Sequence, residues 1–351
     1  MRSSPGNCCL SAYGSTNGQI LKWDGQKCDP DRVLLLRSVV RDRFDRLLRG
    51  ENDSDPINVF IKTEPHKRTK IEQGRWRLIS AVSLIDTFID RILFGWLGRA
   101  CLNTIGETPC LVGWTPVYGG WKELARLYRG KQVLCLDKSA WDWTVPAWLV
   151  KLWLLFILEL GVGAPDWWKY MVCMRFDLLF RTAKFRFSDG TIVSQVGVGV
   201  MKSGCFLTII LNSVGQSMLH YRVMYVLRQS DSRLSYTQKQ PKCVGDDTVQ
   251  EVPDDWQRYC SIIGGLGFVV KPAEPQSWVE FCGSAINNDR CVPAYWKKHL
   301  YKLCYAEDMF GTLTSYQILY ANEPEMFNFI QSLCSKYSPE ALLPAIEAKM
   351  V

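Results

Sequence analysis

Two adjacent carboxylates lie at the centre of the stretch KCVGDDTVQEV, which runs from Lys242 to Val252. Asp246 and Asp247 follow a glycine and separate two short apolar segments, a pattern that predicts a β-hairpin with the aspartates at its tip. Adjacent carboxylates repel each other, and burying either one is costly unless a cation neutralises it. Because Gly-Asp-Asp is also ordinary turn chemistry, this stretch alone is compatible with a solvated turn and with a metal site.

A third carboxylate, Asp137, follows the apolar run Val133–Leu136 in the segment LCLDKSAWDW. An apolar run of this length predicts a buried strand, so Asp137 is expected at the end of that strand. If the strand lies beside the hairpin, Asp137 and Asp246 face each other and form an oxygen-rich site for two Mg²⁺ ions about 4 Å apart. Two ions in that arrangement stabilise the attacking and the leaving oxygen of a phosphoryl transfer.

Polar residues on an otherwise apolar helix form a second group of candidates. The segment KSGCFLTIILNS opens with Ser203 and Gly204, which allow a tight turn before the helix. Thr208 and Asn212 are four residues apart and therefore share one helix face. With Asp142 they would suit the 2′-hydroxyl of a ribose, and a site that binds this hydroxyl rejects a nucleotide without it. Hydrogen bonds from Thr208 and Asn212 to backbone carbonyls are the equally open alternative.

The elements that must position these residues are strands and helices without a strict alternation, which predicts the α+β class. Residues 56–83 have the pattern of a strand, a basic loop and a second strand. Residues 185–200 have the pattern of a hairpin around an Asp-Gly pair. A long helix is predicted for residues 203–227, and mainly helices follow from about Pro293 onward.

An amphipathic helix is predicted for residues 29–50, where apolar residues recur at helical spacing and a glycine ends the segment. Arginines are distributed around its polar side. Their usual meaning is a solvated face, with nucleic-acid contact as the less favoured alternative. These arginines are Arg37, Arg41, Arg43 and Arg46.

The most apolar segment, PAWLVKLWLLFILELGVG, covers residues 146–163. Lys151 and Glu159 interrupt it, and its uninterrupted apolar run, Leu152–Leu158, is too short to span a bilayer. The segment therefore predicts a buried helix, with a membrane contact as the less favoured alternative.

Composition narrows the class of protein further. The chain has 351 residues, 47% of them hydrophobic, which suits one enzyme with subdomains and a sizeable core. The formal net charge of +7 fits an anionic partner such as nucleic acid, although many ordinary proteins match it. The 14 cysteines include no C-x-x-C pair and there are only 3 histidines, so zinc is not expected. Irregular cysteines without a signal peptide favour a reducing compartment.

The order of three motifs, D-x4-D, then S-G-x3-T-x3-N-S, then G-D-D, resembles the palm of viral RNA-dependent RNA polymerases. Residues 61–79 resemble the basic fingers motif of that family, residues 267–274 its lysine-carrying segment, and residues 280–286 its primer-grip hairpin. The stretch SSPGNCC resembles the template-guiding loop, although Cys8 replaces the usual proline. The K-x-E-P-H-K pattern within the basic motif is most similar to that of the positive-strand sobemovirus and polerovirus group.

The resemblance implies the catalytic centre of an RNA-directed RNA polymerase, a nucleotidyltransferase. Asp137 and Asp246 would hold two Mg²⁺ ions, with Mn²⁺ as a substitute. Asp247 and the carbonyl of Lys138 would assist. Lys271 is implied as the general acid for the departing pyrophosphate. The residues implied to select the ribonucleotide are Asp142, Ser203, Thr208 and Asn212, and those implied to line the triphosphate channel are Lys62, Lys70, Arg75 and Arg77.

For the basic motif, a solvated loop is the alternative to a triphosphate channel.

The implied reaction is the in-line attack of an RNA 3′-hydroxyl on the α-phosphate of an NTP. The implied fold is a right hand with fingers, a palm of antiparallel sheet flanked by helices, and a short helical thumb. Its expected parts are fingers at 1–130, with the template loop near 3–8 and the basic motif at 61–79, palm at 131–148, a fingers insertion at 149–195, palm at 196–290 and thumb at 291–351.

The implied partners are template and nascent RNA, NTPs and other viral replication proteins, without zinc and without a transmembrane segment. The implied location is the host cytoplasm, at membrane-associated replication complexes reached through partners.

A reverse transcriptase is disfavoured by Val244 and by Asn212, a polar partner for the 2′-hydroxyl. Since the chain starts close to the template loop and its thumb is short, a compact variant or part of a longer chain is expected. A catalytically incomplete, RNA-binding relative that needs a missing segment is the remaining alternative.

Overall fold

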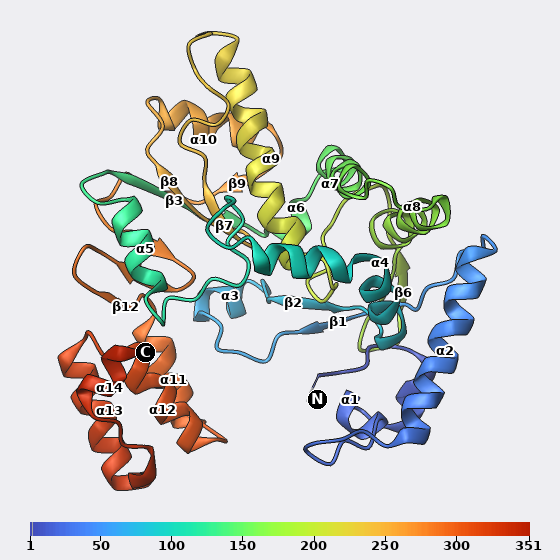
Figure 1. Cartoon of the computed structure of the whole chain (residues 1–351), viewed down its shortest axis with the longest axis horizontal. Coiled ribbons are helices and arrows are strands. Elements are labelled where there is room, and N and C mark those ends of the chain that lie inside the picture. Colours follow the sequence, from blue (N-terminus) through green and yellow to red (C-terminus); the bar gives the residue numbers. More distant parts are fainter. Residues whose placement is uncertain (2) are drawn as a thin grey trace. The chain divides into compact units, whose positions relative to one another are not determined.

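The computed structural model describes residues 1 and 3–351 (Figure 1). These residues form two compact units. Unit 1 comprises residues 1–104, 139–219 and 263–269. Unit 2 comprises the remaining segments, 105–138, 220–262 and 270–351. The mixture of helices and strands confirms the predicted α+β class. The units are defined by compactness, so the division into fingers, palm and thumb stays a prediction.

Helices make up most of unit 1. Asp29 caps α2 by accepting a hydrogen bond from the Arg32 amide at 3.0 Å, which confirms the predicted helix start. Ser83 caps α4 in the same way, through the amide of Asp86 at 3.1 Å. The helices are η1 (Cys9–Tyr13), α1 (Asn17–Ile20), α2 (Pro30–Leu48), α3 (Arg68–Glu72), α4 (Leu84–Asn103), α6 (Trp141–Thr144), α7 (Ala147–Leu160), α8 (Asp166–Phe180) and the first part of α9 (Thr208–Arg228).

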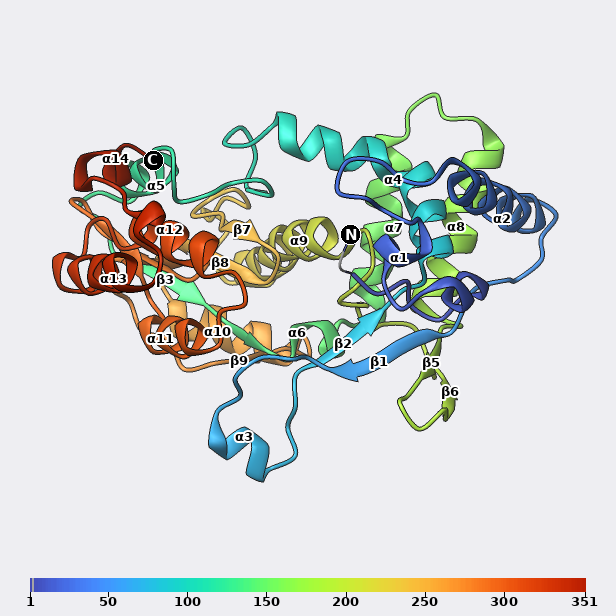
Figure 2. The same ribbon diagram turned by 90° about the horizontal axis from the view of Figure 1, so that it is seen from below.

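The sheet of unit 1 has the strand order β2-β1-β5-β6. β1 pairs antiparallel with β2 and parallel with β5, and β5 pairs antiparallel with β6. Both predicted strand pairs are therefore confirmed. Figure 2 shows α3, in the connection between β1 and β2, projecting beyond the ends of these strands. The strands are β1 (Ile57–Ile61), β2 (Leu78–Ala81), β5 (Lys184–Arg186) and β6 (Ile192–Ser194).

A buried network of charged residues joins α2, α4 and α8. Arg43 is only 5% exposed and donates to Asp86 at 2.7 Å, so the prediction that it lies on a solvated face is wrong. The physical reason is spacing, because Arg43 lies on the same helix face as the buried residues Leu36, Val40 and Leu47. Without its carboxylate partners, a guanidinium at this position would be costly to bury.

The helix predicted to be buried, α7, is buried on one face only. Trp153 and Ile157 are fully enclosed, but Leu152, Leu155 and Leu160 are 37%, 45% and 48% exposed. α7 packs against α8 (Figure 1), and its opposite face has no such cover within unit 1 among the residues described, so the prediction is wrong for that face. Across the described part of the chain, no helix combines the length and apolar character needed to cross a membrane.

Unit 2 contains two three-stranded antiparallel sheets, ordered β3-β8-β7 and β10-β11-β12. Leu124, Val133, Val249 and Phe281 belong to a shared apolar core, which holds the two sheets against α5. The strands are β3 (Val133–Leu136), β7 (Lys242–Val244), β8 (Asp247–Glu251), β10 (Val279–Phe281), β11 (Ser284–Ile286) and β12 (Cys291–Pro293). The helices here are α5 (Gly120–Leu127), the second part of α9 and most of α10 (Trp256–Gly265). The two-residue strands β4 (Lys138–Ser139) and β9 (Val269–Val270) stand where the chain passes between units.

The last part of unit 2 is helical, as predicted from about Pro293 onward (Figure 1). It has its own apolar core, which includes Leu313, Tyr316, Ile330 and Cys334. The elements are α11 (Trp296–Cys304), α12 (Met309–Leu319), α13 (Pro324–Tyr337), η2 (Pro339–Ala341) and α14 (Ala345–Met350).

Candidate functional site

The two adjacent aspartates lie at the tip of the β7–β8 hairpin in unit 2, as the sequence predicts. Val244 pairs with Asp247, which leaves Gly245 and Asp246 as the two-residue turn. Gly245 has φ +63°, as the first position of a type II′ turn requires, and glycine adopts this conformation without steric cost. Asp246 and Asp247 are both exposed at this tip.

The strand that ends before Asp137 lies beside this hairpin. β3 pairs antiparallel with β8, and Leu136 is the partner of Thr248. One step further along this register, Asp137 reaches the level of Asp247. The predicted meeting of the strand end and the hairpin tip is therefore confirmed, with Asp247 rather than Asp246 at the same level as Asp137.

Asp247 lies in an environment that favours its protonated form. The pKa of Asp247 is raised to about 6, first because protein atoms crowd its carboxyl group although the residue remains exposed, and then by the negative charges of Asp246 and Asp137. Burial and the same hairpin charges raise the pKa of the Cys282 thiol to about 12. Excess negative charge in one place is the electrostatic condition that a bound cation relieves.

Two lysines supply positive charge next to the carboxylates. The Lys271 ammonium forms an ion pair with the Asp137 carboxylate. The backbone amide of Lys271 donates to the Asp137 carbonyl at 2.9 Å. Lys138 is 3% exposed and donates from Nζ to the Thr248 hydroxyl at 3.4 Å. Burial lowers the pKa of Lys138 to about 8, against the opposing influence of charges that include Asp246. Sequence reasoning missed this side chain, although strand alternation puts it on the opposite face from Asp137, toward the interior.

The donor set of this site fits a divalent cation. Carboxylate oxygens are the ligands that Mg²⁺ prefers, and three carboxylates meet at one end of a sheet. Within the described residues, however, no three acidic, histidine or cysteine side chains are arranged closely enough to hold a metal ion. Instead, Lys271 provides the counter-charge for Asp137. The chemistry of the residues therefore suits a metal, while the Asp137 carboxylate is paired with the Lys271 ammonium.

In unit 1, the structure brings Asp142 and Asn212 together. The Nδ2 of Asn212, on α9, donates to Oδ1 of Asp142, on α6, at 2.9 Å. Because a carboxylate accepts only from the amide nitrogen, this bond fixes the orientation of the Asn212 amide. Its Oδ1 is buried and has no hydrogen-bond partner among the residues that the structure describes. A buried acceptor without a partner is costly, so this oxygen suits a ligand hydroxyl.

Ser203 and Thr208 make contacts within the protein. α9 begins at Thr208, five residues later than predicted, because residues 203–207 form turns and a bend. The Thr208 hydroxyl lies 2.6 Å from the Lys202 carbonyl and 2.8 Å from the Cys205 carbonyl, as the backbone alternative predicts. Ser203 contacts Ser80 of β2, a residue that the sequence analysis did not single out.

The four basic candidates lie on or between β1 and β2 and do not form one cluster. Arg77 Nη1 and Lys62 Nζ both contact the carboxylate of Glu64, at 2.7 and 3.3 Å. Lys70 belongs to α3, and Arg75 contacts Gln73. Glu64 was missed because its role as a shared partner depends on strand pairing that brings residues 62 and 77 together.

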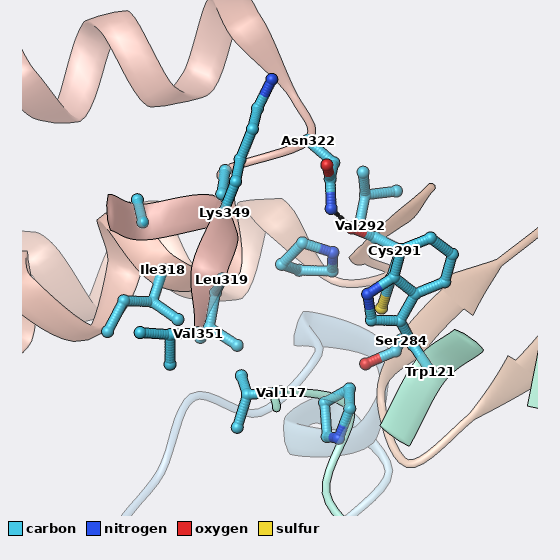
Figure 3. Close-up of a pocket in the computed structure, with 14 residues that line it drawn as sticks. Val117, Trp121, Ser284, Cys291, Val292, Ile318, Leu319, Asn322, Lys349 and Val351 are labelled. Carbon is cyan, nitrogen blue, oxygen red and sulfur yellow. Dashed lines mark hydrogen bonds between the residues drawn. The ribbon is translucent and has the colours of Figure 1, made fainter. Parts of the chain in front are cut away.

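A separate hollow of unit 2 lies between α5, the β11–β12 hairpin and the last helices (Figure 3). Trp121, Val292 and Val351 are among its lining residues, and Asn322 donates to the Cys291 carbonyl at its edge at 3.5 Å. None of its described lining residues is acidic. The hollow is therefore distinct from the carboxylate site.

Comparisons with known proteins agree with the motif order. Residues 25–281 match the family model of viral RNA-dependent RNA polymerase. The replicase polyprotein P2AB of Cocksfoot mottle virus is 31% identical over 261 residues, covering 71% of this chain and 26% of that protein. The corresponding polyprotein of Southern bean mosaic virus is 30% identical over 323 residues, covering 86% and 31%.

Protein P1-P2 of Turnip yellows virus is 26% identical over 276 residues, covering 72% of this chain and 24% of that protein. These matches confirm the resemblance to the sobemovirus and polerovirus group, and the chain spans less than a third of the length of these relatives. Among solved structures, the Sicinivirus 3Dpol RNA-dependent RNA polymerase matches with a TM-score of 0.73 at 19% identity, covering 99% of this chain and 76% of that chain. This likeness confirms the predicted polymerase fold.

Proposed function

Because this chain belongs to the family of viral RNA-dependent RNA polymerases, we propose that it transfers nucleotides from NTPs to an RNA 3′-hydroxyl, directed by an RNA template. The observation that carries the proposal is the meeting of Asp137, Asp246 and Asp247 at the joined ends of β3 and the β7–β8 hairpin. Polymerases of this family generally use divalent metal ions. The raised pKa of Asp247 supports a cation at this point, since a cation relieves the mutual repulsion of the carboxylates.

The proposed cofactors are two Mg²⁺ ions, with Mn²⁺ as a substitute. Asp137 and Asp246 would hold them, and Asp247 and the Lys138 carbonyl would assist. When bound, such ions activate the 3′-hydroxyl and stabilise the leaving pyrophosphate. If Asp137 were to hold a cation, the Lys271 ammonium would be freed from its ion pair, and its Nζ would donate the proton that the pyrophosphate takes up.

The proposed selection of ribonucleotides depends on the Asp142–Asn212 pair. Asp142 orients Asn212, whose Oδ1 accepts a hydrogen bond from the ribose 2′-hydroxyl. A deoxynucleotide leaves that oxygen buried and unpaired, which disfavours its binding. Ser203 and Thr208 complete this group in the proposal, chiefly by shaping the turn before α9.

The proposed triphosphate contacts come from the β1–β2 connection. Lys62 and Arg77 share Glu64, so an entering triphosphate competes with one carboxylate for two cations. Lys70 and Arg75 would add charge further along the same connection. RNA would be bound mainly through its backbone, so its affinity should fall steeply as the salt concentration rises.

The proposed partners are template RNA, nascent RNA and other viral replication proteins, without zinc. We place the activity in the host cytoplasm, at membrane-associated complexes reached through partner proteins. The proposed division into fingers, palm and thumb keeps the boundaries expected from the sequence.

Primer extension on an RNA template with NTPs and Mg²⁺ tests the proposal. Asp246→Ala should abolish extension while RNA binding and the unfolding temperature stay near wild type, because Asp246 is an exposed turn residue. Asp289→Ala, another exposed aspartate in a turn of unit 2, is the matched control and should extend normally. Extension by Asp246→Ala at the wild-type rate would refute the assignment. RNA binding by the wild type without synthesis would favour the incomplete, RNA-binding alternative.

A further inference from the structure

Two serines that are 123 residues apart bind each other reciprocally in unit 1. The Ser80 amide, in β2, donates to the Ser203 hydroxyl oxygen at 3.0 Å. The Ser203 amide donates to the Ser80 hydroxyl oxygen at 2.9 Å, and the two hydroxyl oxygens are 3.3 Å apart. Each serine therefore satisfies the backbone donor of the other. We call this arrangement the serine clamp.

Gly204 extends the serine clamp with a backbone contact. Its amide donates to the Ser80 carbonyl at 3.0 Å. A Cβ atom at Gly204 would lie 2.8 Å from that same oxygen and 3.1 Å from Cα of Ala81. Glycine is thus required here because the turn and the strand approach closely, and any side chain would push them apart.

On the β2 side, the serine clamp is continuous with the basic motif. Arg77 directly precedes β2, and its carbonyl accepts a hydrogen bond from the Lys62 amide at 2.8 Å. Ser80, three residues after Arg77, is 3% exposed. A shift of the strand at Ser80 would therefore also move the backbone that carries the Lys62 and Arg77 side chains.

On the other side, the serine clamp holds the turn that leads to the ribose group. The Met201 amide donates to the Asp142 carbonyl at 2.7 Å. The Thr208 hydroxyl closes the turn on the Lys202 carbonyl, and Asn212 follows one helical turn later. The backbone around Ser203 is therefore tied to both members of the Asp142–Asn212 pair, directly or through the start of α9.

We propose that Ser80 is a positioning residue of the nucleotide site, which holds the triphosphate-binding strand and the ribose-sensing turn in one rigid arrangement. This inference rests on the proposed polymerase function. Ser80 has no role in the chemical step, because its hydroxyl is buried against Ser203. Removing the Ser80 hydroxyl leaves the Ser203 amide without its acceptor, so that only the two hydrogen bonds to the Ser80 backbone still hold the turn to the strand, and the turn is held less firmly.

Kinetics with matched nucleotide pairs test the role of Ser80. Ser80→Ala should raise the KM for NTPs about tenfold and lower the preference for NTPs over dNTPs about tenfold, with kcat changed less than about twofold. Ser80→Thr keeps the hydroxyl and should restore both values. Gly204→Ala should reproduce the Ser80→Ala result by a different route. Ser194→Ala, an exposed serine of β6 in the same sheet, is the control and should change neither value.

Unchanged KM and unchanged preference in both Ser80→Ala and Gly204→Ala would overturn the proposal. A loss of kcat alone would also overturn it, since a positioning role predicts a change in KM and in nucleotide preference.

Amide hydrogen exchange tests whether the serine clamp forms, and it does not require an active enzyme. In the full chain without RNA, Ser80→Ala should speed exchange at the amides of Ser203 and Gly204 about tenfold or more, and Ser194→Ala should not. Unchanged exchange would overturn the serine clamp whatever the polymerase assay shows. If Ser80→Ala speeds exchange as expected but the wild-type chain extends no primer, the proposed function is overturned and the serine clamp stands.

Discussion

Replacing Asn212 with alanine should weaken the preference for ribonucleotides. Asn212 is 5% exposed, and its amide nitrogen is held by Asp142 at 2.9 Å. Its Oδ1 therefore points away from Asp142, and it has no partner within the described chain. The 2′-hydroxyl of a bound NTP donates to this oxygen, whereas a bound dNTP leaves the oxygen buried and unpaired.

The size of the effect follows from the cost of that unpaired oxygen. A buried acceptor without a partner costs about 1–3 kcal/mol. Since about 1.4 kcal/mol corresponds to a factor of ten in rate, Asn212 should contribute about 5- to 150-fold to discrimination. In Asn212→Ala the oxygen is absent, so the dNTP loses its penalty and the NTP loses its hydrogen bond. The ratio of kcat/KM values should fall by about that factor.

Single-nucleotide primer extension measures this ratio directly. Each NTP and its matching dNTP are compared on one RNA template, for the wild type and for Asn212→Ala. Asn328→Ala, on an exposed position of α13, is the matched control and should keep the wild-type ratio. A ratio that stays within about twofold of wild type would refute the reasoning. Equal losses for both nucleotides would refute it as well, because they indicate general damage to the site.

Three further predictions concern stability and proton transfer. Burial raises the pKa of Asp86 to about 6 against the pull of Arg175. Because the folded pKa exceeds the unfolded value of about 4, stability should fall as the pH rises from about 4 to about 6, and Asp86→Asn should remove this slope in thermal unfolding. Arg175→Met leaves Asp90 buried without its partner and should cost about 3–5 kcal/mol, measured by denaturant unfolding. Lys271→Met should slow extension about a hundredfold and leave the unfolding temperature near wild type. The control Lys336→Met, on α13, should change neither the extension rate nor the unfolding temperature.

Local sequence patterns were enough to predict the elements around the candidate site. The apolar run before Asp137 is short and the Gly-Asp-Asp turn needs a positive φ, so a strand end and a hairpin tip follow from residues that are close in sequence. The same holds for the helix predicted over residues 29–50 and for the helical character after Pro293. These features depend on backbone preference and side-chain spacing, which each segment carries by itself.

Burial was harder to predict than secondary structure. Arg43 looks like a surface residue in the sequence, and its burial depends on carboxylates from other elements, including Asp86 of α4. Leu152 and Leu155 look like core residues, yet both are exposed on α7, whose main packing partner among the described elements is α8. In both cases the environment of a side chain is set by neighbours that are distant in sequence, and helical periodicity does not specify them.

The sequence by itself determined the family, the order of the motifs and the types of residue available for chemistry, because these depend on identity and local spacing. Only the tertiary structure decided which groups meet: Lys271 with Asp137, Asn212 with Asp142, and Ser80 with Ser203. Each of these contacts joins segments at least 70 residues apart. They form because strand pairing and helix packing, stabilised by burial of apolar surface, bring backbones to within hydrogen-bonding distance. A hydrogen bond of about 3 Å depends on that final packing, so no local pattern in either segment predicts it.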